Sequence, residues 1–557
     1  MSKLHSAWQK RRYGWLWLVV LFLAWANIAL AQQSPVFASS KEHPSASQEK
    51  PRITPEETKQ LFSLVDDLLK FSSQETGLSI KSEVKRQITT RTKVESYLAE
   101  KFAEDESAKR LQRGEIVLKK FGLLDRDFQL KPFLLALLKE QIEAYYDTKT
   151  KTVFMLDWVN IEEQKPVLAH ELTHALQDQR VDLEKWNDQT PDDIPLNSSQ
   201  DSDHLAKDEM DTAREAVVEG QATAVMMDYI LKPMGKSLIK NPEVMELAKQ
   251  QMTTPESSPV LSRAPLLLSE SLLFPYREGL SFEQDLWMDQ GQTAAFAGAM
   301  DRPPTSTWEI VNPREYERKS APSIPLLPNI HPLVDTLYKP YDIGQIGVLD
   351  LHILAEILAG ENAASALSSA WDGGIYWAGQ LRSAQTPEAQ SKTDSLALFY
   401  LSAWKNNASA QAFAKYYANN LGRKYSGLKP YRISTSAASE NSSGDIETVF
   451  TTNEGPVLIV IRGKSVFVAE SFNLELARKL ATLVLDGQST GELELVRADQ
   501  PGRLQKSGAP EPDESGLDSA TRDLNANNTL SGGLVHFLSS NGVMKAAVEA
   551  GMKAAVR

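Results

Sequence analysis

The chain has 557 residues, of which 42% are apolar and 24% charged, with a net charge of −13 and no cysteine. This length exceeds one ordinary domain, and the composition is that of a globular protein, so two or three compact units are expected. The lack of cysteine excludes disulfides, thiolate zinc sites, iron–sulfur clusters and cysteine nucleophiles, so a bound metal must be held by His, Asp or Glu.

The first 31 residues have the pattern of an export signal. Four basic residues lie within the first 12, an apolar run follows from 15 to 30, and Ala29-Leu30-Ala31 has the small residues of a cleavage site. The apolar run is short for a membrane span, so a cleaved signal is favoured over an uncleaved anchor. We therefore expect an exported protein, periplasmic or extracellular after cleavage near Ala31.

Charge restricts the partners of the mature chain. Removal of the signal leaves 56 basic against 73 acidic residues, a net charge of −17. An acidic chain without a basic cluster is not expected to bind nucleic acid, nor a membrane beyond the export signal. Nothing in the sequence indicates an oligomeric state.

The segments before the central motif are predicted as a tether and a helical region. Residues 32–52 are rich in Ser, Pro and Gln and are expected to be flexible. Residues 53–130 show apolar side chains at helical spacing, and the run Thr54-Pro55-Glu56-Glu57 is typical of a helix start. A metal-binding core is predicted over 131–260.

A hairpin is predicted just before the central motif. The pattern indicates a helix to about Lys139, then strands at 142–146 and 152–156 around a turn at 147–150. Zinc peptidases commonly bind an extended substrate along the edge of such a strand through backbone hydrogen bonds. An ordinary structural hairpin is an equally good interpretation of the sequence.

The central motif is HELTH, within VLAHELTHALQDQ at 167–179. On a helix His170 and His174 lie one turn apart and present both imidazoles from one face. This spacing suits two of the three protein ligands of a catalytic zinc, with Glu171 beside them to take a proton from water. Pro166 is placed in the first turn of this helix, where proline is tolerated.

The third ligand is sought downstream. Residues 178–203 are polar and are predicted as a surface loop, and a second helix is predicted over 208–231. Metzincins need a third His six residues beyond the second, but this position is Arg180. A Glu on the second helix is the alternative, with Glu219 as the leading candidate and Glu215 as its rival.

Together, HELTH and the VEGQAT stretch at 218–223 resemble the gluzincins, the metallopeptidase group that includes thermolysin and zinc aminopeptidases. The wider context also resembles a group of uncharacterised exported bacterial proteins with a predicted zincin core. The resemblance implies one catalytic zinc, an α/β core around two helices, peptide-bond hydrolysis, and Glu219 as third ligand from an EG-x-A-T stretch.

The chain departs from the gluzincin pattern in three ways. The 45-residue gap between His174 and Glu219 is longer than in the aminopeptidase branch, and the GAMEN-like strand that binds a substrate amine is absent. An acid that orients a zinc His in thermolysin-like members is replaced by Thr223. Glu215 could take that orienting role, and Asp178 is either a neighbour of the ligands or a surface residue.

The C-terminal half is predicted to complete the peptidase unit. Residues 261–440 are expected to be mostly helical, with an irregular Pro-rich stretch over 240–330 and a helical region over 342–420 broken at 371–379. A small strand and helix unit is expected over 441–487, and a largely disordered tail with a short terminal helix over 488–557. The predicted fold class is α+β, predominantly helical, with a zincin-like core.

Five other residues have side chains that could serve a functional site. Tyr376 and His331 are candidates for stabilising an oxyanion, although a structural role is favoured for both. His352 stands one turn from Glu356 and is interpreted as part of a polar helix edge, because no third group is evident. His204 lies in the predicted loop and is expected to be solvated.

The sequence thus predicts an exported zinc metallopeptidase that acts on a peptide or protein, with Glu171 as general base and zinc held by His170, His174 and Glu219. The alternative is a catalytically inactive zincin-fold envelope scaffold or binding protein. A third reading is a peptidase blocked by its N-terminal helical region or by residues 265–330. Substrate specificity, and endo- against exopeptidase action, are not indicated.

Overall fold

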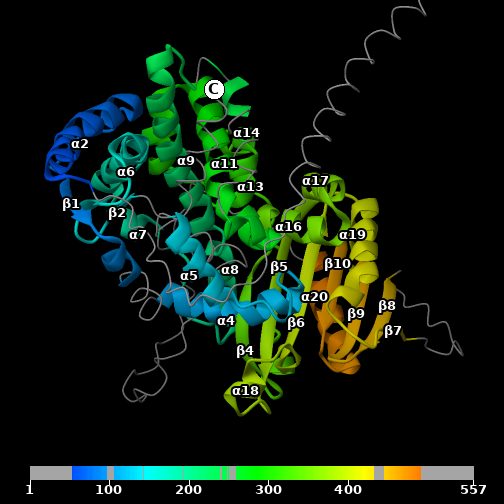
Figure 1. Cartoon of the computed structure of the whole chain (residues 1–557). Helices are drawn as coiled ribbons and strands as arrows, with labels where there is room; N and C mark the ends of the chain where they lie inside the picture. Colours follow the sequence, from blue (N-terminus) through cyan, green and yellow to red (C-terminus); the bar gives the residue numbers. More distant parts are fainter. Residues whose placement is uncertain are drawn as a thin grey trace, which may run out of the picture. The chain divides into compact units, whose positions relative to one another are not determined.

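The chain has an α+β fold with a small mixed sheet and a larger antiparallel sheet, as a computed structural model shows (Figure 1). This structure describes residues 53–96, 106–141, 144–187, 189–191, 193–238, 241, 243–246, 249, 259–431 and 445–490. The predicted export signal (1–31), tether (32–52) and tail from 491 lie outside these residues. Within the described part, no helix combines the length and apolar character needed to cross a membrane.

Helix α2 (Pro55–Thr76) opens the described chain as the sequence predicts. Thr54 accepts a hydrogen bond from the Glu57 amide, and the Glu57 side chain accepts one from the Thr54 amide, which satisfies two amides at the helix start. Gly77 ends the helix in the left-handed conformation (φ 71°). The buried face of α2, with Leu61 and Val65 fully enclosed, packs against the motif helix.

The small sheet carries the predicted hairpin. Its strands are β1 (Lys85–Thr89), β2 (Ala144–Asp147) and β3 (Thr152–Leu156), in the order β1-β3-β2. β1 runs parallel to β3 and β2 antiparallel, so β2 lies at an edge. The prediction of strand 152–156 is confirmed; of the other predicted strand, residues 144–146 are in β2 and 142–143 are not described. Helices α4 (Glu106–Phe121) and α5 (Leu130–Gln141) precede the hairpin.

The motif helix α6 (Ile161–Val181) is longer than predicted at its start. Asn160 caps it by accepting from the Glu163 amide, which places Pro166 inside the helix rather than in its first turn. The prediction of a surface loop over 178–203 is also wrong in part. Two short helices, α7 (Leu183–Asn187) and α8 (Ser198–Lys207), lie there, and Asn197 caps the second.

Two long helices follow the motif helix: α9 (Met210–Leu231), close to its predicted bounds, packs against α6, and α11 (Leu266–Gln290) packs against α9. The sequence predicted an irregular stretch over 240–330, and this prediction is wrong over the residues that form α11. Pro275 and Gly279, both poor helix formers, lie inside α11 and explain the missed prediction.

Short helical segments lie between the two long helices and between α11 and the large sheet. They are η1 (Lys232–Met234), η2 (Leu261–Arg263), the π-helix η3 (Ala294–Gly298), α12 (Ala299–Asp301), α13 (Thr307–Val311), α14 (Pro313–Glu317) and α15 (His331–Val334). A π-helix is rare, occurs mostly as a single turn within an α-helix, and is frequent at functional sites. This one lies against α11.

The large sheet has seven strands in the order β4-β5-β6-β10-β9-β8-β7, with every neighbouring pair antiparallel. They are β4 (Tyr338–Gln345), β5 (Trp371–Leu381), β6 (Leu396–Trp404), β7 (Lys429–Pro430), β8 (Ile446–Thr452), β9 (Gly455–Arg462) and β10 (Ser465–Glu470). The predicted helical region over 342–420 is therefore wrong where β4 ends and where β6 lies, whereas its predicted break at 371–379 coincides with most of β5. The predicted strands after 441 exist, but they extend this sheet rather than form a separate small unit.

Helices cover both faces of the large sheet (Figure 1). Alternate residues of β5 show the two faces: Tyr376 joins the core shared with the helical part, whereas Ile375 and Trp377 join a second core under α20. The helices of this half are α16 (Val348–Ala359), α17 (Glu361–Ala370), α18 (Pro387–Gln390), α19 (Asn407–Asn420) and α20 (Leu474–Thr490), with the turns η4 (Thr393–Ser395) and η5 (Leu421–Arg423).

A buried ion pair ties α4 to the end of the large sheet. The ammonium of Lys120 is fully enclosed and donates to Glu454 at 2.8 Å and to the Ser471 hydroxyl at 2.6 Å. Arg126 lies 3.3 Å from the same carboxylate. Charges taken this far out of water must be paired, so these contacts fix the N-terminal helices to the sheet.

Candidate metal centre

Two helices bring together the three residues of the candidate centre. His170 and His174 lie one turn apart on α6, and Glu219 lies on α9, which packs along α6. His170 Nε2 is 3.0 Å from Glu219 Oε2, and His174 Nε2 is 3.6 Å from Glu219 Oε1. All three residues are buried, with exposed fractions of 0%, 7% and 2% in chain order.

The donor set fits a zinc ion. One ligand atom from each of the three residues can be chosen so that all lie within 4.8 Å of one another. Tetrahedral zinc with bonds of 2.0–2.1 Å separates its donor atoms by about 3.3 Å, which is close to the two separations between the imidazoles and the carboxylate. Two imidazoles and a carboxylate are also donors that zinc prefers when no thiolate is present.

Glycines allow α9 to carry Glu219 this close. A Cβ on Gly220 would lie 2.9 Å from Gly279 Cα and closer still to its carbonyl, and a Cβ on Gly279 would lie 2.9 Å from the Ala216 carbonyl carbon. The backbones of α9 and α11 are therefore in direct contact, which only glycine permits at both positions. Glu219 is next to this crossing in the chain, so the crossing sets its distance from α6.

Glu171 is held by the small sheet. Its Oε2 accepts a hydrogen bond of 2.7 Å from the Tyr146 amide of β2. Because β2 pairs with β3 on its other side, this amide points away from the sheet and towards the motif helix. The edge strand β2 of the predicted hairpin thus lies beside Glu171.

Asp178 holds the same hairpin rather than the ligands. Its carboxylate accepts from the Tyr146 hydroxyl at 2.8 Å and pairs with Lys151 at 2.7 Å, and it also accepts from the Leu183 amide. None of these partners is an imidazole of the motif. Asp178 therefore holds the hairpin of β2 and β3 against α6. Because Tyr146 contacts both Asp178 and Glu171, the same contacts help to position Glu171.

Glu215, the rival third ligand, lies one turn from Glu219 but does not join the cluster of ligand atoms. Its Oε2 accepts a hydrogen bond of 3.2 Å from Asn187 at the end of α7. The geometry therefore favours Glu219 over Glu215 as a ligand.

Tyr276 of α11 is a residue of this site that the sequence did not reveal. Its ring lies nearly parallel to that of His170, with centroids 6.3 Å apart. Burial, followed by the charges of Glu219, Glu215 and Glu171, raises the pKa of its hydroxyl well above the ordinary value. The hydroxyl therefore stays protonated beside these carboxylates.

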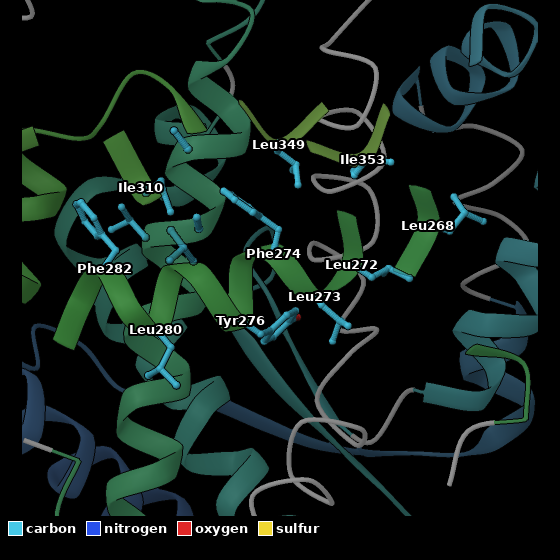
Figure 2. Close-up of a cluster of buried hydrophobic side chains, with 14 of the residues drawn as sticks. Leu268, Leu272, Leu273, Phe274, Tyr276, Leu280, Phe282, Ile310, Leu349 and Ile353 are labelled. Carbon is cyan, nitrogen blue, oxygen red and sulfur yellow. The ribbon is translucent and has the colours of Figure 1, made fainter. Parts of the chain in front are cut away.

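Helical spacing explains how Tyr276 reaches the site. Leu273, Tyr276 and Leu280 share one side of α11, whereas Phe274 extends to the side where Leu349 lies (Figure 2). From the sequence alone, a tyrosine within this apolar stripe cannot be distinguished from an ordinary core residue. Only the crossing with α9 shows that it faces carboxylates.

The two candidates for an oxyanion group lie elsewhere. His331 contacts Asp201 at 3.0 Å and Asp335 at 3.2 Å, and it belongs to α15. Tyr376 lies in the large sheet, and its hydroxyl is 3.0 Å from where a Cβ on Gly344 would stand. Their contacts agree with the favoured structural roles.

His204 was expected to be solvated, and this prediction is wrong. It is fully buried on α8, and its Nε2 is 3.6 Å from Asp208. The cause is the unpredicted helix α8, which turns His204 inward next to Leu205. Burial raises the pKa of Asp208 well above its ordinary value.

His352 and Glu356 have a third neighbour that the sequence did not show. Glu361, at the start of α17, lies 3.3 Å from His352, and the three residues form a second cluster of potential ligand atoms. Glu361 is exposed and the other two are partly exposed. Exposed acidic groups gather often without a metal, so this cluster remains a polar helix edge.

Comparison with known proteins returned no match of any kind: no family model, no curated sequence and no solved structure is similar to this chain.

Proposed function

We propose that the chain is an exported zinc metallopeptidase with a gluzincin-like centre in a zincin-like core. The observation that supports this most is the convergence of His170, His174 and Glu219 from two helices into one buried cluster. Of the two histidines and two acids that the sequence offers as ligands, His170, His174 and Glu219 place one ligand atom each within 4.8 Å of one another. A bound zinc would supply Lewis-acid polarisation of a peptide carbonyl and of water.

Glu171 supplies the proton transfer in this proposal. It follows His170 directly, so it lies on α6 at the cluster, and its carboxylate is anchored by the Tyr146 amide. This hydrogen bond orients the carboxylate, which in this proposal accepts a proton from water and passes it to the leaving amine. An anchored base has a defined direction, and such positioning accounts for much of enzymatic rate enhancement.

The edge of β2 is the proposed place for the peptide. β2 is an edge strand of the small sheet, and on the side where it pairs with no strand its Tyr146 amide donates to Glu171. A peptide added to this edge would be held by backbone hydrogen bonds with its scissile bond near the cluster. This arrangement suits a peptide or protein in extended form, without selecting side chains.

The experiment compares wild type with Glu171→Gln. Zinc content should be equal in the two proteins, because Glu171 is not among the three ligands, whereas cleavage of casein or of a broad peptide library should occur only with wild type. The loss should be at least about 100-fold, the usual contribution of a general base. Zinc binding with no cleavage by wild type would instead identify an inactive zincin-fold scaffold, and the absence of both would refute the metal centre.

A further inference from the structure

A line of hydrogen bonds between side-chain amides connects His174 to the π-helix η3. His174 Nδ1 lies 2.9 Å from Gln177 Oε1, and Gln177 Nε2 donates to Gln221 Oε1 at 2.9 Å. Gln221 Nε2 in turn donates to the carbonyls of Ala295 and Phe296, both at 3.0 Å. Both glutamines are completely buried, one on α6 and one on α9.

The direction of every bond in this line follows from backbone carbonyls, which can only accept. Gln221 must turn its amide nitrogen to Ala295 and Phe296, so its oxygen faces Gln177. Gln177 must turn its nitrogen to the Val218 carbonyl at 3.0 Å as well as to that oxygen. Reversal of either amide would place oxygen against oxygen in a dry interior, at the cost of a buried unsatisfied acceptor.

The same logic assigns the tautomer of His174. Gln177 can offer only its oxygen to the ring, so Nδ1 must carry the hydrogen and donate. Nε2 then carries the lone pair, and this is the nitrogen that faces Glu219 at 3.6 Å. The neutral imidazole is thereby presented in the form that a metal binds.

We propose that Gln177 and Gln221 are positioning residues that hold His174 in one tautomer and one orientation, with η3 as the fixed end of the line. The metal affinity of the centre then depends on the π-helix, although no residue of η3 reaches the ligands. This inference rests on the proposed metal centre and deepens it. Neither glutamine touches substrate or metal, and both act through the ring of His174.

The line of hydrogen bonds ends at two backbone carbonyls of the π-helix η3. Two successive carbonyls of η3, those of Ala295 and Phe296, accept hydrogen bonds from the same amide group of Gln221. η3 itself packs on α11, the helix that crosses α9 at Gly279. A shift of α11 would therefore move both the Glu219 side and the His174 side of the centre.

The experiment measures zinc affinity by competition with a chromophoric chelator in wild type, Gln177→Met, Gln221→Met and the double variant. Methionine keeps the volume and removes the hydrogen bonds. Loss of the partner of a ligating imidazole weakens metal binding by about 10- to 100-fold, and we expect this for Gln177→Met with a smaller loss for Gln221→Met. If the two act in series, the double variant should lose little more than Gln177→Met alone.

A matched control is Gln284→Met. Gln284 is also a buried amide, and it donates to the Leu238 carbonyl at 3.0 Å, which is not part of this line. Its replacement should lower stability without a change in zinc affinity. The absorption spectrum of the cobalt-substituted protein gives a second readout, since altered ring orientation changes the ligand field in the Gln177 variant and not in the control.

The outcomes separate the inference from the function. Failure of wild type to bind zinc would refute the metal centre itself. Zinc bound by wild type and, within about twofold, by both Gln177→Met and Gln221→Met would overturn the positioning role alone. An equal loss in Gln284→Met would overturn it too, because it would show an effect of general destabilisation. Should Gln177→Met not fold, Gln221→Met decides, since it leaves the contacts of Gln177 with His174 and Val218 in place.

Discussion

Replacement of Gly220 by alanine tests how the two helices hold Glu219 at the centre. The added Cβ would stand 2.9 Å from Gly279 Cα and nearer to its carbonyl, distances that packed atoms do not adopt. Because the obstacle is backbone, no side-chain rotation relieves it, and α9 must move from α11. Glu219, the neighbouring residue, would be displaced from His170 and His174.

The size of the effect follows from two opposing terms. Overpacking in a tight core costs about 1–3 kcal/mol and occasionally more. Alanine in a helix gains up to about 1 kcal/mol over glycine, which offsets part of this cost. We therefore expect Gly220→Ala to lower the free energy of unfolding by about 2 kcal/mol. We also expect weaker zinc binding, because a displacement of Glu219 separates the ligand atoms.

Gly114→Ala is the matched control. Gly114 lies inside α4 with nothing within 4 Å of the position of its Cβ, so alanine there should stabilise the protein by about 0.5–1 kcal/mol. Urea unfolding of wild type and both variants measures the two free energies, and chelator competition measures zinc affinity. If Gly220→Ala were as stable as Gly114→Ala and bound zinc like wild type, the close helix crossing would not position the ligand.

Two further predictions concern buried charges. Burial and the charge of Asp350 raise the pKa of Glu209 to about 8 from 4.5, so wild type loses stability as the pH rises between these values. Glu209→Gln should remove up to about 5 kcal/mol of that loss. If the unfolding free energy of the variant fell as much as that of wild type between about pH 5 and about pH 9, the raised pKa of Glu209 would be contradicted. Lys120→Met should destabilise by about 3–5 kcal/mol in urea unfolding because Glu454 stays buried with one cation fewer. The exposed pair of Lys479 provides the comparison, where methionine should change little.

Local patterns predicted the elements whose side chains show one clear periodicity. The motif helix, the strand at 152–156, the helix of Glu219 and the three strands after 445 follow from spacing and turn residues alone. The pair His170 and His174 was found for the same reason, since a four-residue spacing is a local property. Glu219 was proposed on other grounds, namely its place on the second predicted helix and the resemblance of its EG-x-A-T stretch to the gluzincins.

Long-range packing decided what the sequence did not show. α11 contains Pro275 and Gly279, which argue locally against a helix, yet the crossing with α9 requires the glycine. The strands β5 and β6 are buried on both faces, so their apolar runs lack the alternation that identifies a strand.

The partners of the site were hidden for the same reason. Gln177 and Gln221 are polar residues at core positions of two helices, and their function exists only where those helices meet. Tyr276 lies 57 residues beyond Glu219 in the chain and reads as core. A buried glutamine in a predicted apolar helix face is the one local signal that could have directed attention to the line of amides.

Metal analysis of three proteins decides whether the buried cluster is a zinc centre: wild type, Glu219→Ala and Glu215→Ala. With the ligand set proposed from this structure, wild type and Glu215→Ala should each hold one zinc ion per chain, and Glu219→Ala should hold none. Zinc retained by Glu219→Ala and lost from Glu215→Ala would contradict the assignment of the third ligand, and a wild type without bound metal would contradict the centre as a whole.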